Sequence, residues 1–496
     1  MFRLIVAALL LNQLVMLASA DEKPRPVGTV VIGTARSSTK DRADLVVDGR
    51  DDGFELRKAF ARLGPQGGTV RLLPGRYRLD SSTPVQVPSN TTLDGGGNAI
   101  IECSVKGQHG ALWLKDVHDV VIRGVRFESS DNDSAAMFAM MNVGTGKSRD
   151  VTIRDCHFAG FKTYALRMNQ PGTRFRFIHN HLRRMGCVGK GGSAINGARM
   201  IDSLIGWNFV EHCGVDAGDW AIYVSAGGAR NLQIVGNTIR DCAAGIKDLG
   251  DGSDRKILIA RNVISGIRRG RSIALGGCRN VLVTGNMITM GNGAAGIGTE
   301  TTIHQVVISN NIIDMNGKGS TLQPAIGVAA DDSTDISIIN NQVSGGGPNA
   351  SCIVVATVKG GLIANNLLRV GHGKVGGVLM GGCGIRIGRL GTPHAWHLLV
   401  TGNLIQSPVS RNAGIQLTTG KATAKSPPKS DVQLVGNTIR GFQFAITLDR
   451  NGAGRYRNVV IRGNTSSSAP LVGKMASNDA RITIESNTSP KPAKKR

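Results

Sequence analysis

One stretch of the chain concentrates the residue types that catalyse reactions of sugars. Acidic, basic and aromatic side chains gather between residues 211 and 254, namely Glu211, His212, Asp216, Asp219, Trp220, Tyr223, Lys247, Asp248, Asp251 and Asp254. Two reactions fit such a set. Elimination at a uronate needs a base next to a cation that neutralises the carboxylate, whereas hydrolysis of a glycosidic bond needs a pair of carboxyl groups that flank it.

The elimination hypothesis assigns Lys247 as the base, Tyr223 as its proton-transfer partner and Arg167 as the cation for the substrate carboxylate. A lysine can act as a base where its surroundings lower its pKa. The hydrolysis hypothesis instead pairs Asp219 with Asp248 or Asp251.

Each of these residues also has a structural interpretation. Lys247 can be an ordinary solvated charge, and Asp248 falls where other repeats carry an inward aliphatic residue. Trp220 can stack on a sugar ring, because aromatic faces bind sugars, or it can pack under a loop. The sequence leaves these alternatives open.

A repeated short phrase is expected to position these residues. It reads small residue, aliphatic, any residue, aliphatic, as in "AIYV" at residues 221–224 and "GIRI" at residues 384–387. Alternation of this kind is typical of a strand with one buried face, so the third residue points outward. Stacked repeats then form an outward column of Arg167, Asn196, Tyr223, Lys247, Ala274, Gly298, Gly327, Val354, Arg386, Gln416 and Thr447. Its small central residues are expected to form a flat floor, and Arg167, Asn196, Trp220 and Arg386 are the candidate substrate-binding residues.

A second phrase, exemplified by "LQIVGNTIRDC" at residues 232–242, places an asparagine among aliphatic residues in every repeat. The interval between these asparagines ranges from 23 residues (Asn464 to Asn487) to 37 residues (Asn366 to Asn403). Such a period indicates a solenoid. Asparagines at one turn of each coil, about 4.8 Å apart, can hydrogen-bond to one another as a ladder, and asparagine also tolerates a left-handed backbone.

Composition agrees with many short strands and tight turns. The chain of 496 residues has 67 glycines, only 4% aromatic residues and a net charge of +24. The charge favours acidic partners, while the absence of zinc-finger spacing or a basic helix argues against nucleic acid. The eight cysteines are expected to be buried thiols, although Cys213 and Cys242 should stack closely enough for a disulfide.

The ends of the chain have their own signatures. Residues 1–20 are typical of a signal peptide, with Arg3, an apolar stretch and Ala18-Ser19-Ala20, and no later segment can span a bilayer. Residues 21–44 are predicted to be a flexible leader, residues 45–487 the solenoid, and residues 488–496 a basic tail. Residues 51–65 predict an amphipathic helix with a capping box formed by Asp52 and Glu55, and this helix should cover the open end of the solenoid.

Residues 51–79 ("DDGFELRKAFARLGPQGGTVRLLPGRYRL") and residues 85–103 ("VQVPSNTTLDGGGNAIIEC") resemble the start of proteins of the pectate-lyase superfamily. The resemblance implies an all-β, single-stranded right-handed parallel β-helix with an N-terminal capping helix. It does not decide the activity, because that fold carries lyases, hydrolases, epimerases and non-catalytic surface proteins.

We therefore expect a secreted or periplasmic monomer that acts on an acidic or sulfated polysaccharide. Elimination is the first hypothesis, hydrolysis by paired aspartates the second, and non-catalytic glycan binding the third. His179 and His181 flank the ladder position Asn180 without a third ligand, so no metal site is predicted. The resemblance allows calcium as a cofactor, but no carboxylate cluster in the sequence demands it.

Overall fold

The computed structural model describes residues 28–489 except for residues 39, 81–82, 104–110, 130–138, 144–146, 169, 187–191, 198, 217, 226–227, 292–294, 316–322, 329–331, 348–349, 357, 376–377, 389–394, 419–428, 449–455, 468–471 and 473–481. The predicted signal peptide and most of the basic tail lie outside the described residues. Among those described, no helix is long and apolar enough to cross a membrane.

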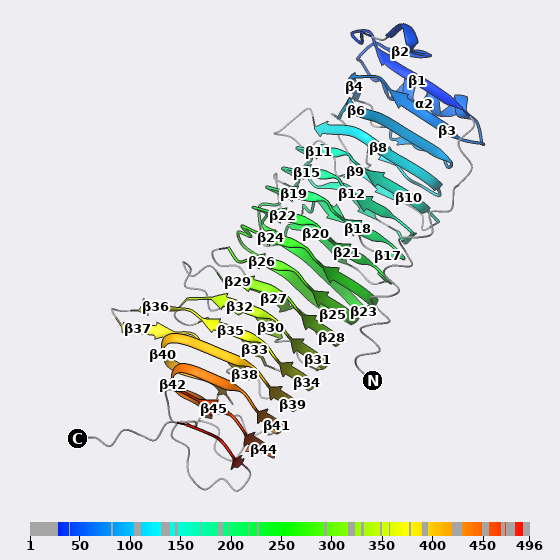
Figure 1. Ribbon diagram of the computed structural model, residues 1–496. Coiled ribbons are helices and arrows are strands. Elements are labelled where there is room, and N and C mark those ends of the chain that lie inside the picture. Colours follow the sequence, from blue (N-terminus) through cyan, green and yellow to red (C-terminus); the bar gives the residue numbers. More distant parts are fainter. Residues whose placement is uncertain are drawn as a thin grey trace.

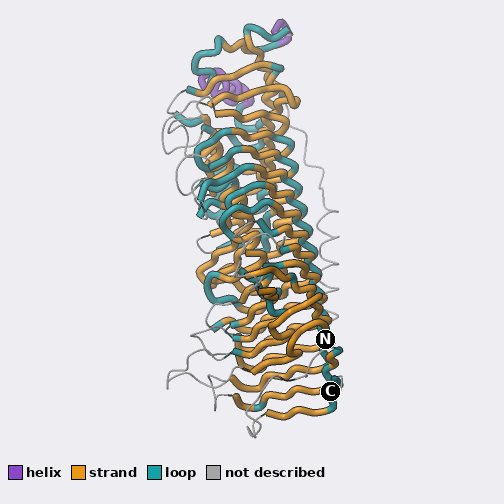
Figure 2. Tube along the Cα trace, turned by 90° about the vertical axis from the view of Figure 1, so that its left-hand side faces the viewer, coloured by secondary structure: helices purple, strands orange, loops and turns teal. Residues whose placement is uncertain are grey.

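The chain winds into an elongated parallel solenoid in which each coil lies directly on the next (Figure 1). Strands of successive coils pair in parallel along its whole length, which confirms the all-β solenoid predicted from the repeat. Viewed from the side, strands occupy nearly every layer and the main helix sits at one end (Figure 2).

Strands at equivalent places in each coil form three stacks, and long strands contribute to two of them. The first stack carries the outward column and comprises β5 (Val85–Gln86), β7 (Leu112–Trp113), β9 (Ala139–Val143), β12 (Tyr164–Met168), β16 (Ile195–Asn196), β20 (Trp220–Ser225), β23 (Ala244–Ala260), β25 (Arg271–Thr284), β27 (Ala295–Thr299), β30 (Ile326–Val328), β33 (Ile353–Val355), β38 (Ile385–Ile387), β40 (Leu404–Leu417) and β42 (Thr438–Leu448).

The second stack precedes the ladder asparagines. Besides β23 and β25 it contains β1 (Thr29–Thr34), β2 (Leu45–Val47), β3 (Gly68–Leu72), β6 (Thr91–Cys103), β8 (His118–Ser129), β10 (Arg149–Arg154), β14 (Arg176–Ile178), β18 (Leu204–Gly206), β21 (Gln233–Val235), β28 (His304–Ser309), β31 (Ser333–Ile339), β34 (Val358–Ala364), β39 (Ala395–Thr401), β41 (Lys429–Val435), β44 (Val459–Arg462) and β46 (Ile482–Glu485).

The third stack follows the asparagines. Besides β6, β8, β40 and β42 it contains β4 (Gly75–Leu79), β11 (His157–Ala159), β15 (His181–Arg183), β19 (Phe209–Glu211), β22 (Thr238–Arg240), β24 (Val263–Ser265), β26 (Met287–Thr289), β29 (Ile312–Asp314), β32 (Gln342–Gly345), β35 (Leu367–Val370) and β45 (Thr465–Ser466). The remaining short strands are β13 (Gly172–Thr173), β17 (Met200–Ile201), β43 (Tyr456–Arg457) and the antiparallel pair β36 (His372–Val375) and β37 (Val378–Gly381).

The asparagine ladder is present as predicted. At Asn237, for example, Oδ1 accepts the backbone N–H and the side-chain amide of Asn208 at 3.0 and 2.9 Å. Its Nδ2 donates to the Ile205 carbonyl and to Oδ1 of Asn262, both at 3.0 Å. Every polar atom of this buried side chain therefore has a partner, which removes the cost of burying it.

The left-handed backbone does not belong to the asparagines themselves. The residue before each one has positive φ, between 47° at Ser486 and 68° at Gly236. Glycine or asparagine fills most of these preceding positions, because both residues adopt this conformation at low cost. The expectation that the ladder asparagines make this turn was therefore wrong by one residue.

The helix α2 (Gly53–Leu63) covers one end of the core, and Leu56, Ala59 and Phe60 are buried against it. The capping box is absent, because Asp52 has a helical backbone and its side chain does not cap the helix. The Asp52 carboxylate instead accepts the backbone N–H groups of Gly49 at 3.0 Å and Arg78 at 2.7 Å.

The described part of the predicted leader contains regular secondary structure. Strand β1 pairs with β2 and β3, and the short helix η1 (Lys40–Arg42) follows it.

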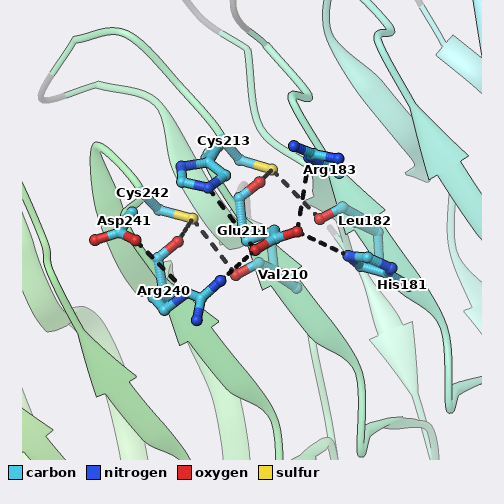
Figure 3. Close-up of polar contacts among 10 residues, drawn as sticks. His181, Leu182, Arg183, Val210, Glu211, Cys213, Arg240, Asp241 and Cys242 are labelled. Atoms are coloured by element: carbon cyan, nitrogen blue, oxygen red, sulfur yellow. Dashed lines mark hydrogen bonds and ion pairs between the residues drawn. The ribbon is translucent and has the colours of Figure 1, made fainter.

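The seven cysteines that the structure describes are buried free thiols, and Cys213 and Cys242 direct their sulfur atoms to backbone carbonyls, as Figure 3 shows. Cys187 lies outside the described residues.

Candidate functional site

The outward column has the register that the repeat predicts. Arg167 pairs with Asn196, Asn196 with Tyr223 and Tyr223 with Lys247, and the pairing continues coil by coil to Thr447. These side chains leave the same face of the first stack, one rung of about 4.8 Å apart.

Lys247 lies among aromatic rings and a carboxylate. Its Nζ is 5.2 Å from the ring centre of Trp220 and 5.7 Å from that of Tyr223, within the range of cation–π attraction. The same nitrogen is 2.7 Å from Oε2 of Glu300, and the lysine side chain is only 15% exposed. Lys247 is therefore a held cation rather than a freely solvated charge.

Glu300 also holds a second cation. Its Oε1 accepts a hydrogen bond from Arg271 at 2.9 Å, so one carboxylate bridges two basic side chains from neighbouring coils. The Arg271 side chain crosses the column at Gly298, where an added Cβ would lie 2.8 Å from its Nε, and Pro324 covers Gly327 in the same way. The small residues therefore do not form an open floor but make room for these side chains.

Trp220 is buried, 3% exposed, and packs on Ala244 and Ala274. Lys247 and Tyr223 lie against this cluster, so the indole supports them rather than presenting a face to a sugar. The packing interpretation of this tryptophan therefore describes the structure better than the stacking interpretation.

The other candidate binding residues lie along the column at some distance from Lys247. Arg167 stands over the ring of Tyr164 at 5.8 Å, and Asn196 lies between it and Tyr223. Burial lowers the pKa of the Arg167 guanidinium from its usual value. Arg386 donates from Nε to Oε1 of Gln416 at 3.3 Å and lies five rungs from Lys247, about 24 Å away.

The two aspartates of the hydrolysis hypothesis do not face the column. Asp219 is fully buried, and its carboxylate accepts the backbone N–H groups of Gly192, Val215 and Asp216, each at 2.8 Å. It therefore fastens two loops together. Asp248 is also fully buried and pairs in register with the core residues Val224 and Leu275, so it points into the solenoid. The side chain of Asp251 lies outside the described residues.

The residues around Lys247 do not fit a calcium ion, which needs several oxygen ligands. Their carboxylate, Glu300, is already bound to two cations. Across the part of the chain that the structure describes, no three His, Cys, Asp or Glu side chains are placed to hold a metal.

Glu300 and Arg271 are the members of this cluster that the sequence did not reveal. Arg271 lies three residues before the column position Ala274, and Glu300 lies two residues after Gly298. The repeat predicts which strand each residue follows, but not that two long side chains meet across coils. The one available signal was an acidic residue close to a column of small residues.

Comparison with known proteins supports the handedness of the fold. A family model described as a right-handed β-helix region matches residues 220–389, about the middle third of the chain. The fold is a right-handed parallel β-helix. No curated protein matches the sequence of this β-helix.

Solved structures with a similar chain path include three kinds of protein. The A-module of the mannuronan C-5 epimerase AlgE6 of Azotobacter vinelandii is 15% identical, with a TM-score of 0.41, 90% of this chain covered and 97% of that one. The tailspike of Escherichia coli bacteriophage HK620 in complex with a pentasaccharide is 12% identical, with a TM-score of 0.47 and coverage of 89% and 76%. The surface protein and adhesin PfbA of Streptococcus pneumoniae is 13% identical, with a TM-score of 0.39 and coverage of 89% and 94%. At these identities the likeness concerns the fold alone.

Proposed function

We propose that this β-helix binds an acidic polysaccharide across the outward column at Lys247, and that it cleaves a uronate polymer there by β-elimination. The observation that carries the proposal is the cluster of Tyr223, Lys247, Arg271 and Glu300, in which two cations and a phenol meet on one face. The net charge of +24 favours a polyanionic substrate.

The geometry favours a different division of roles from the one expected from sequence. Because Glu300 engages both basic side chains, Lys247 and Arg271 suit the neutralisation of a substrate carboxylate better than proton abstraction. Tyr223, one rung away, then transfers the proton. The reaction removes the proton next to the carboxylate, forms a carbon–carbon double bond and expels the glycosidic oxygen, which takes up a proton.

Incubation with pectate, alginate, chondroitin sulfate and sulfated algal glycans tests this proposal. Elimination gives unsaturated uronates that absorb in the near ultraviolet, whereas hydrolysis gives reducing ends without that absorbance. We expect Tyr223→Phe to lower kcat by about 10²-fold or more and Lys247→Ala to raise KM as well. Arg279→Ala, which removes an exposed cation beyond the column, should leave both constants unchanged.

Non-catalytic binding is the second candidate. It is favoured by the burial of Asp219 and Asp248, which leaves Glu300 as the carboxylate of the cluster, and Glu300 is already paired. Retention of the protein on an acidic glycan column, with neither new absorbance nor new reducing ends, would replace the lyase assignment by this one.

We further propose that the chain is exported before it acts, as residues 1–20 predict. Fractionation of the producing cells, together with N-terminal sequencing of the mature protein, tests this. A mature chain that begins with Met1 in the cytoplasm would contradict it.

A further inference from the structure

Five aromatic rings lie side by side on a face distinct from the outward column. His157, His181 and Phe209 occupy the same register position of β11, β15 and β19, with ring centres 4.8 and 5.0 Å apart. His179 and Trp207 lie two residues before His181 and Phe209 in the same coils. Their rings stack with centres 5.3 Å apart and an interplanar angle of 9°. We call these five residues the aromatic plate.

Trp207 is held in an unusual backbone conformation. It has a φ of 53°, at the position before the ladder asparagine where eight of the twelve coils use glycine or asparagine. His179 and Arg261 share this conformation at equivalent turns, and it is sterically unfavourable for a residue with a Cβ. The indole is nevertheless 43% exposed, so burial in the core does not explain its presence.

A cleft of about 470 Å³ adjoins the plate. Its polar walls are His157, His179, His181, Asp155 and Arg126, and its remaining lining includes the glycines Gly97 and Gly124. An added Cβ at Gly97 would meet no atom within 4 Å, so the absence of a side chain there leaves the cleft open. The cleft therefore combines ring edges with hydrogen-bonding groups, which is how sugar sites are built.

A buried carboxylate fixes the cations beside the plate. Figure 3 shows His181 and Arg240 pointing to Glu211 from the strands on either side, with contacts of 3.1 and 2.8 Å. Arg183 lies 3.7 Å from the same carboxylate. Although burial alone would raise it, hydrogen bonds from Arg240 and His181 hold the pKa of Glu211 below its usual value. The Arg240 guanidinium also lies over the Phe209 ring at 5.5 Å, so Phe209 and His181 of the plate are connected to the cations around Glu211.

We propose that the aromatic plate and the adjoining cleft form a second saccharide-binding site, which takes an acidic oligosaccharide. The indole of Trp207 stacks on His179 with one face and borders Gly236 of the next coil with the other, and this second face receives the apolar face of a sugar ring. Phe209 lies between His181 and Arg240 and holds these two side chains in place.

Arg126, which pairs with Glu128 at 2.9 Å, and the ring nitrogens of the three histidines hydrogen-bond to an acidic group in the cleft. Burial lowers the pKa of His157, so this ring takes part as a neutral imidazole. The site lies on the third stack and its preceding turn, and it requires no reaction at Lys247.

The test uses the purified chain with defined hexasaccharides of galacturonate, of mannuronate and of heparin, and a neutral cello-hexaose for comparison. Calorimetry gives the affinity, and tryptophan fluorescence reports contact with the indole. We expect at least one acidic oligosaccharide to bind and to change the fluorescence. Trp207→Gly, which suits the local backbone and so keeps the fold, should weaken binding about tenfold, the usual worth of an aromatic contact.

Two controls separate the plate from the rest of the molecule. Met287→Ala removes a side chain about as exposed as Trp207 from the register position of Phe209, three rungs further along the third stack, and this variant should bind like the wild type. Lys247→Ala removes the central cation of the outward column and should retain the binding that depends on Trp207. This result is expected whether or not the proposed function at Lys247 is correct. The proposal is overturned if Trp207→Gly binds as tightly as the wild type, or if none of the acidic oligosaccharides binds.

Discussion

Trp207 occupies a turn whose backbone conformation disfavours a residue with a large side chain. The turn before each ladder asparagine requires positive φ, and five of the twelve coils meet this requirement with glycine. Tryptophan carries the full steric cost of that conformation, which is about 1–2 kcal/mol for a residue with a Cβ. Its ring lies against Gly236 of the next coil, where an added Cβ would be 2.7 Å from Cδ1. The neighbouring glycine therefore accommodates the indole.

This strain predicts an inverted order of stability at position 207. In ordinary structure an alanine variant has a higher free energy of unfolding than a glycine variant. At a φ of 53° the glycine variant should have the higher free energy of unfolding. We expect Trp207→Gly to be more stable to urea than Trp207→Ala by about 1 kcal/mol, although both lack the indole. The same pair of substitutions at Met287, which has no positive φ, should show the usual order. Equal stability of the two variants at position 207 would mean that the turn is not strained.

At the scale of elements, strands were predictable and long-range contacts were not. The alternation in "AIYV" predicts the outward direction of Tyr223 and Lys247, because a strand has a period of two and the ladder fixes the register of each coil. The apolar face of α2 followed equally well from its period. The capping box is absent because the Asp52 carboxylate accepts the backbone N–H groups of Gly49, three residues earlier, and of Arg78, 26 residues later, instead of capping the helix. Glu300 was missed because its partners belong to other coils.

Asp52 makes the capped end of the β-helix sensitive to pH. Burial raises the pKa of its carboxyl from 3.8 to about 6. The folded chain thus holds this proton more tightly than the unfolded chain, so its contribution to stability is present below pH 3.8 and is lost as the pH rises to about 6. The loss amounts to about 3 kcal/mol from a shift of about two pKa units.

The urea midpoint measured between pH 4 and pH 7 checks this. The wild type should show the decline described for Asp52, and Asp52→Asn should lack it, whereas Asp41→Asn, at an exposed carboxyl of η1, should follow the wild type. Identical slopes in wild type and Asp52→Asn would assign the pH dependence to other groups.

At the scale of the whole molecule, the asparagine ladder connects successive coils of the solenoid to one another. Each asparagine serves the coil before it and the coil after it, so side-chain hydrogen bonds run unbroken from Asn180 to Asn487. The two proposed saccharide sites lie on different stacks of this solenoid, and the ladder keeps both of them in register. The period alone was enough to predict this architecture, because a repeated buried amide has few other ways to satisfy its polar atoms.

The ladder predicts that replacing an asparagine by alanine lowers the free energy of unfolding by an amount that depends on its position along the solenoid. In Asn286→Ala, the Ile259 carbonyl and both donors of Asn262 lose the partners they now have at 3.0 Å, deep inside the protein. Each buried group left without a partner costs about 1–3 kcal/mol, so this single substitution should destabilise the chain by several kcal/mol. Asn487→Ala removes the same amide from the last rung, where the side chain is only partly buried and water can replace it. Urea unfolding of the two variants should therefore differ by at least about 2 kcal/mol, because only the central rung lies beyond the reach of solvent. A smaller difference would mean that neighbouring coils relax around the gap, and that strand pairing and core packing hold the coils together without the ladder.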